Sequence, residues 1–141
     1  MKPDFNPGIV REILFTITPH MCPAFDGVLI HRCCSTWSLV HQMEIAARKI
    51  LVDYLEVHEE GIGASVSVEH LAPCIVGRQV RVQARLTEIN HRRHPRVICE
   101  VTAHDSERLL AKGTQTQVVM NKEHLRQYIE RSSHGETNGT L

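Results

Sequence analysis

Two segments of this chain alternate apolar and polar side chains over much of their length. Successive side chains of a β-strand point to opposite faces of a sheet, so the alternation predicts antiparallel strands with one buried face and one solvated face. The pattern is clearest in residues 79–90 and 96–104, where the apolar positions are Val80, Val82, Ala84 and Leu86, and then Val97, Cys99, Val101 and Ala103.

Three further segments are predicted to be strands. Residues 9–18 are rich in β-branched and aromatic side chains and stop at Pro19, and segments 62–72 and 109–120 flank the alternating pair. The sequences HRRHP and DSERL are the expected hairpin connections, and Pro73 and Gly77 bracket another turn. Residues 19–34 show no steady period, so we expect a loop or a short helical cover there.

A single long helix is predicted from Ser35 or Thr36, either of which can cap it, to about Val52. Its apolar residues recur at steps of three and four, which indicates one buried face. These residues are Val40, Met43, Ala47, Ile50, Leu51 and Tyr54. One helix followed by antiparallel strands indicates an α+β fold in which the helix packs on the sheet.

The length of 141 residues fits one domain, which we place at residues 1–131. The sequence KEHLRQYIER within it is expected to add a short polar helix. Residues 132–141, SSHGETNGTL, offer nothing to bury and are predicted to be disordered.

The charge balance argues against nucleic acid and membranes as partners. Sixteen basic and sixteen acidic residues cancel, and no apolar run approaches the ~20 residues of a membrane helix. The N-terminus lacks the apolar core of a signal peptide, so a cytoplasmic location is expected. The dense basic cluster His91-Arg92-Arg93-His94 is either a solvated hairpin turn or a contact for a phosphorylated ligand.

Cysteine and histidine spacing predicts neither disulfides nor a metal site. The five cysteines form no CxxC pair, and the ten histidines make no HExxH or other ligand spacing. We therefore expect reduced thiols and no metal. One cysteine could act as a nucleophile, but nothing in the sequence marks which.

Two polar side chains interrupt faces that should be apolar. Glu44 falls within the helical stripe, in one row with Thr36 and Val40, and His70 falls on the strand face of Val66. Because an unpaired buried carboxylate is costly, Glu44 and His70 are predicted to meet. The alternative is that Glu44 lies at the edge of the stripe and His70 is a core or interface residue.

This set of residue types supports acyl transfer or hydrolysis. A carboxylate can act as nucleophile or base, an imidazole can move a proton, and a hydroxyl can orient either group. Gly61 and Gly63 would let backbone N–H groups approach an oxyanion, or they only make the loop flexible.

The chain resembles the hotdog-fold thioesterases, and most closely the fluoroacetyl-CoA thioesterase type. The resemblance covers about residues 35–125 and rests on MEIAARKILVDYLEVHEEGIGASVSVEH, LAPCIVGRQVRVQARL and VTAHDSERLLAKGTQTQVV. It implies a strongly curved antiparallel sheet wrapped around one long helix. It also implies a homodimer or a dimer of dimers with acyl-CoA sites at the subunit interface.

The same resemblance assigns roles to individual residues. It implies a catalytic set of Thr36, Glu44 and His70, with Glu44 as nucleophile or base, His70 as proton carrier and Thr36 as their hydrogen-bonding partner. Gly63 would lie near the thioester. With Ile62 and Val40 it is expected to contact the substrate, an acyl-CoA whose hydrolysis needs no further cofactor.

Two departures from the family bear on the substrate. The family type carries phenylalanines in a lid before its catalytic threonine, where this chain reads GVLIHRCC with only Phe25 nearby. A late arginine of the family corresponds to Gln117. We therefore expect a short or medium acyl group other than fluoroacetyl. A hydratase or dehydratase, with His104-Asp105 as a weak candidate pair, and a non-catalytic acyl-CoA-binding module are the alternatives.

Overall fold

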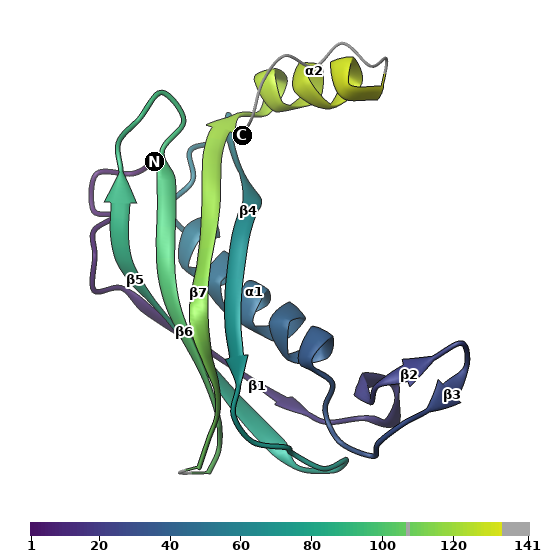
Figure 1. The fold of residues 1–141 in the computed structure, drawn as a ribbon. Helices are drawn as coiled ribbons and strands as arrows, with labels where there is room; N and C mark the ends of the chain where they lie inside the picture. Colours follow the sequence, from purple (N-terminus) through teal and green to yellow (C-terminus); the bar gives the residue numbers. More distant parts are fainter. Residues whose placement is uncertain (107, 134–141) are drawn as a thin grey trace.

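The computed structural model describes residues 1–106 and 108–133, in which a five-stranded antiparallel sheet curves around one long helix (Figure 1). The strand order is β1-β5-β6-β7-β4, which makes β1 and β4 the two edges. The strands are β1 (Val10–Thr16), β4 (Glu59–His70), β5 (Gln79–Asn90), β6 (Arg96–Asp105) and β7 (Arg108–Asn121). The predicted α+β layout is confirmed.

Helix α1 (Thr36–Val52) packs on the concave face of the sheet. Ser35 caps it, because its side chain accepts a hydrogen bond of 3.2 Å from the Ser38 backbone N–H. Apolar residues of α1 and of the inward faces of β5 and β6 form the core, as their periodicities predict. Its fully buried members include Leu39, Met43, Ile50, Val80, Val82, Val97 and Val101.

The segment 19–34 contains more structure than the predicted cover. A short 3-10 turn, η1 (Pro19–Met21), precedes a two-stranded hairpin of β2 (Ala24–Phe25) and β3 (Val28–Leu29), which projects from the body in Figure 1. Asp26 and Gly27 both have positive φ, 51° and 79°, as two-residue hairpin turns require. Strands of two residues are too short to show any alternation.

At the C-terminal end, helix α2 (Lys122–Ser133) extends two residues beyond the predicted polar helix. The remainder of the predicted disordered tail, 134–141, lies outside the described residues. Within the described ranges, no helix is long and apolar enough to cross a membrane.

Candidate active site

Glu44 is solvent-exposed in this chain, which contradicts the prediction of a carboxylate inside the buried stripe. The buried face of α1 passes through Leu39, Met43, Ala46 and Ile50. One step along a helix rotates the side chain by about 100°. Glu44 therefore follows Met43 onto the flank of the stripe, and its charge needs no buried partner.

A β-bulge in β4 decides which residues face the helix. Gly63 pairs with Gln117 and the next pair is Ser65 with Thr116, so Ala64 is an extra residue without a register partner. The extra residue reverses the alternation, and Gly63 and His70 consequently share the helix-facing side. Strict alternation would place Ala64 on the face of Val66 and His70. The bulge leaves Val66 and His70 on one face, as predicted, but takes Ala64 out of the pattern.

Thr36 and His70 form a direct pair at the start of α1 and the end of β4. The Thr36 hydroxyl lies 2.9 Å from His70 Nδ1, and His70 Nε2 lies 3.1 Å from the Ala72 carbonyl oxygen. A carbonyl only accepts hydrogen bonds, which assigns the ring proton to Nε2. Nδ1 is then an acceptor, and Thr36 donates to it.

Glu44 lies instead against Gly63, in a hollow of about 440 Å³ between α1 and β4. A Cβ atom added at Gly63 would stand 3.2 Å from Glu44 Oε1, so the carboxylate lies next to the place that a larger side chain would occupy. Ile62, a predicted substrate contact, lines the same hollow. Val40 is half-buried and is not among the described residues that line it.

The three predicted catalytic residues thus fall into two groups within one chain. Glu44 lies eight helical steps after Thr36, a rise of about 12 Å along the axis of α1. Among the described residues no hydrogen bond joins Glu44 to His70. The expected contact between them is absent within this chain, and the hollow beside Glu44 and the Thr36–His70 pair lie along the same side of β4.

Two glutamines of β7 line the hollow and were not marked as a pair by the sequence. Gln117 faces Gly63 in register and donates from Nε2 to the Ala47 carbonyl oxygen at 3.2 Å. Gln115 faces Val66 and is also buried. Both lie in a part of β7 in which consecutive residues are buried. The alternation of apolar and polar residues therefore could not predict that these two side chains face the helix.

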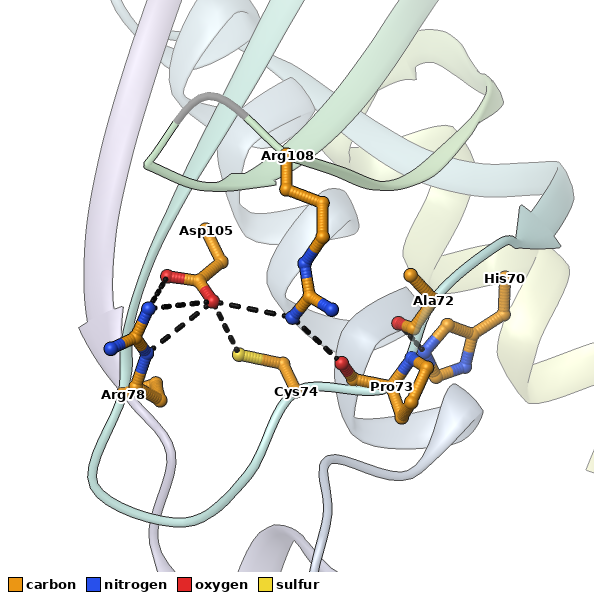
Figure 2. A network of polar contacts seen from close by, with 7 residues as sticks. All are labelled: His70, Ala72, Pro73, Cys74, Arg78, Asp105 and Arg108. Atoms are coloured by element: carbon orange, nitrogen blue, oxygen red, sulfur yellow. Dashed lines mark hydrogen bonds and ion pairs between the residues drawn. The ribbon is translucent and has the colours of Figure 1, made fainter.

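The loop 71–78, between β4 and β5, is held by a network around Asp105 (Figure 2). Arg108 Nη2 donates to the Pro73 carbonyl oxygen at 2.9 Å and to Asp105 at 3.3 Å, while Arg78 binds both Asp105 oxygens. Desolvation raises the pKa of Asp105, but the hydrogen bonds and charges of the two arginines outweigh it and leave that pKa below its usual value. The network therefore holds the loop that supplies the Ala72 carbonyl to His70.

The basic cluster forms the predicted hairpin turn between β5 and β6. Arg93 and His94 line a surface hollow with His124, Tyr128 and Arg131 of α2. The contact with a phosphorylated ligand stays a prediction. In residues 1–106 and 108–133, no group of three His, Cys, Asp or Glu side chains is arranged to hold a metal ion.

Comparison with known proteins gives the fold and the family. The family model described as fluoroacetyl-CoA-specific thioesterase (FlK) matches residues 17–123. Among curated proteins no match was found. A Thermus thermophilus hypothetical protein, described as a thioesterase superfamily member, is 30% identical with a TM-score of 0.87, covering 94% of this chain and 96% of its own.

Two further solved structures share the fold. The fluoroacetyl-CoA thioesterase FlK is 24% identical with a TM-score of 0.79, covering 89% of this chain and 96% of its own. A hot-dog-like protein from Thermanaerovibrio acidaminovorans is 21% identical with a TM-score of 0.81, covering 98% and 99%. The family model spans most of the chain, and the protein therefore belongs to the fluoroacetyl-CoA-specific thioesterase family and has the hotdog fold.

Proposed function

We propose that this protein hydrolyses a short- or medium-chain acyl-CoA, with Thr36, Glu44 and His70 as its catalytic residues. The observation that carries the proposal is the exposed Glu44 carboxylate beside Gly63 at the wall of a hollow. An exposed carboxylate without an ion pair among the described residues remains available as a base. A solved structure of FlK holds acetyl-CoA, which supports the substrate class.

Glu44 has the chemistry that thioester hydrolysis requires. As a base, it takes a proton from a water molecule while the water oxygen forms a bond to the thioester carbonyl carbon. The carbon–sulfur bond then breaks, and the sulfur leaves as a thiol after taking up a proton. Alternatively, the carboxylate attacks the carbonyl carbon itself and water resolves the resulting anhydride.

Gly63 lets the substrate carbonyl approach the strand backbone, because a larger side chain there would meet Glu44. The Thr36–His70 pair, which belongs to the proposed site although no hydrogen bond among the described residues joins it to Glu44 within one chain, can relay a proton. A proton taken up by His70 Nδ1 passes to the Thr36 oxygen while the Thr36 hydroxyl proton moves to the leaving sulfur, and both side chains end unchanged. The Ala72 carbonyl keeps the imidazole in the tautomer that this role needs.

The proposal includes a homodimer in which a second copy pairs along β4. This strand is an edge of twelve residues beside the candidate site, whereas the opposite edge, β1, has seven. Long open edges are normally covered in native proteins. Val66, an apolar residue of this edge strand that a partner would cover, is exposed.

The remaining details of the proposal concern substrate and location. Gln117, where the family type has arginine, lines the hollow and supports an acyl group other than fluoroacetyl. No cofactor is proposed apart from the coenzyme A of the substrate. Five free cysteines support the proposed cytoplasmic location.

The test is release of free thiol from a panel of acyl-CoAs of two to eight acyl carbons. We expect turnover by the wild type and a loss of at least ~100-fold in Glu44→Gln and in His70→Ala, the usual scale for a proton-transfer group. Both side chains lie outside the buried core, so the melting temperatures should stay close to that of the wild type.

The same panel separates the alternatives. Full activity in both variants would refute the catalytic assignment. If the wild type binds acyl-CoAs but releases no thiol, the non-catalytic binding module is correct. No observation favours a hydratase, since Asp105 is bound by two arginines rather than by His104.

A further inference from the structure

Gln115 carries a buried amide oxygen that no part of the fold uses. The residue is 2% exposed, and its Oε1 atom accepts no hydrogen bond from any described residue. Buried polar atoms are almost always paired in native proteins, because an unpaired one loses its hydration without compensation. Ser38 Oγ is also buried and has no partner among the described residues, but of the two only Gln115 lines the hollow beside Glu44, which a ligand could enter.

The position of Gln115 places this acceptor in the candidate active site. Gln115 lines the hollow that contains Glu44 and Gly63. It faces Val66 in register, two residues along β7 from Gln117 and on the His70 side of it. Its amide therefore lies between the Glu44 carboxylate and the Thr36–His70 pair, where the acyl end of a bound thioester would lie.

The neighbouring glutamine shows how the fold uses a buried amide at this place. Gln117 is equally buried, but its Nε2 atom donates to the Ala47 carbonyl oxygen and ties β7 to α1. Ile45 and Ile62 supply apolar walls to the same hollow. The hollow thus offers an acyl chain apolar contacts, the exposed Glu44 carboxylate and the buried, unpaired Gln115 Oε1 atom.

We propose that Gln115 recognises a hydroxyl group on the acyl chain, so that the substrate is a short hydroxyacyl thioester. This inference rests on the proposed function. Oε1 needs a donor, and neither the thioester group nor a plain alkanoyl chain has one. A hydroxyl at C2 or C3 donates to Oε1 and can accept from Nε2. The pantetheine amides are also donors, but they are common to every acyl-CoA.

The experiment compares acyl groups on the same carrier. Dissociation constants are measured by calorimetry for 3-hydroxybutyryl-CoA against butyryl-CoA and for lactoyl-CoA against propionyl-CoA. The protein carries Glu44→Gln, which is expected to prevent turnover during the titration. We expect the hydroxylated member of at least one pair to bind about 10-fold tighter or more, the effect of one buried hydrogen bond gained. Equal dissociation constants in both pairs would overturn the inference.

Variants at two glutamines isolate the contact. Gln115→Met, added to Glu44→Gln, should bring the ratio of dissociation constants to about 1, and the shorter amide of Gln115→Asn should reduce it. Gln83→Met, the same change at a residue that bonds Glu12 outside the hollow, is the control and should keep the preference. A preference that survives Gln115→Met would also refute the role of Gln115.

Thermal unfolding without ligand gives a second readout. Gln115→Met fills similar space without an unpaired acceptor, so its melting temperature should equal or exceed that of the parent. Gln117→Met loses a real hydrogen bond, and its melting temperature should fall. A clear loss of stability in Gln115→Met would reveal a structural role and contradict the inference.

The experiments distinguish a failure of this inference from a failure of the proposed hydrolase function. A hydroxyacyl preference in binding, without hydrolysis by the wild type, would support this inference and refute the hydrolase. Hydrolysis without any preference would support the hydrolase and refute this inference alone.

Discussion

The five cysteines of the chain differ in how far the fold suppresses their reactivity. Burial raises the pKa of Cys34 and that of Cys99 to about 11, and burial is also the largest cause of the raised pKa of Cys74. Cys22 is buried as well, whereas Cys33 is half-exposed. Because the thiolate is the reactive form, Cys33 should be the accessible thiol of the native protein.

A thiol titration with a disulfide reagent at pH 8 checks this expectation. We expect one fast thiol in the native protein and five after unfolding. Raising the pH from 8 to 9 should still leave Cys34 and Cys99 unreactive, since thiols with a pKa of about 11 remain almost entirely protonated there. Cys33→Ser should abolish the fast phase and retain turnover. Two or more fast thiols would contradict the burial of the others.

At the scale of elements, the loop 71–78 connects both parts of the Thr36–His70 pair. The Cys34 backbone N–H, two residues before Thr36, donates to the Cys74 carbonyl oxygen at 2.8 Å. On the other side the loop supplies the Ala72 carbonyl to His70 Nε2. A shift of this loop would therefore move the start of α1 and the imidazole together.

Variants of two arginines can show whether the loop 71–78 positions His70 for catalysis or only stabilises the fold. Arg78 and Arg108 both bind Asp105, but only Arg108 also donates to the Pro73 carbonyl oxygen (Figure 2). Arg78→Met and Arg108→Met should lower the melting temperature by similar amounts. Arg108→Met alone should lower kcat, by about 10-fold, because the Ala72 carbonyl no longer fixes His70.

The measurements are thermal unfolding and kcat on the best substrate of the panel. Equal losses of kcat in the two arginine variants would show that the network only stabilises the fold. Arg108→Lys keeps the charge but loses the planar fork, so it should recover stability better than kcat.

A helix or strand could be predicted from the sequence where its apolar residues recur at regular spacing and are the residues that become buried. Helix α1 and strands β5 and β6 follow their apolar patterns to within a residue or two. The bulge at Ala64 could not be predicted, because one extra residue leaves no trace in composition and yet reverses the face of every residue after it. The hairpin β2–β3 was missed because its strands are two residues long.

Some residues of the candidate site could be predicted from the sequence and others could not. Thr36, Glu44 and His70 could be identified from residue types, their spacing and the family resemblance, although Glu44 proved to be on the flank of the stripe. Gln115 could not be identified, since an unpaired buried amide is a property of its surroundings and not of its sequence. Whether Gln115 Oε1 is paired depends on how close the hydrogen-bond donors of other residues lie, and only the folded chain specifies those distances.

At the scale of the whole molecule, the sheet presents two open edges of different character. β4 runs beside the candidate site, and Val66 on it is 43% exposed. β1 is shorter, and its exposed apolar residue, Leu14, is 63% exposed. Since the chain carries no net charge, two copies do not repel each other strongly, and pairing along β4 would bury the longer edge.

Sedimentation velocity at micromolar concentration tests the dimer and its edge together. We expect the wild type to sediment as a dimer or a larger even assembly. Val66→Lys places a charge on the β4 edge and should shift the population to monomers, because an unpaired charge cannot be buried in an apolar contact. Leu14→Lys makes the same change on the β1 edge and should leave the dimer intact. A monomeric wild type would refute the interface, and a monomer produced by Leu14→Lys alone would move it to β1.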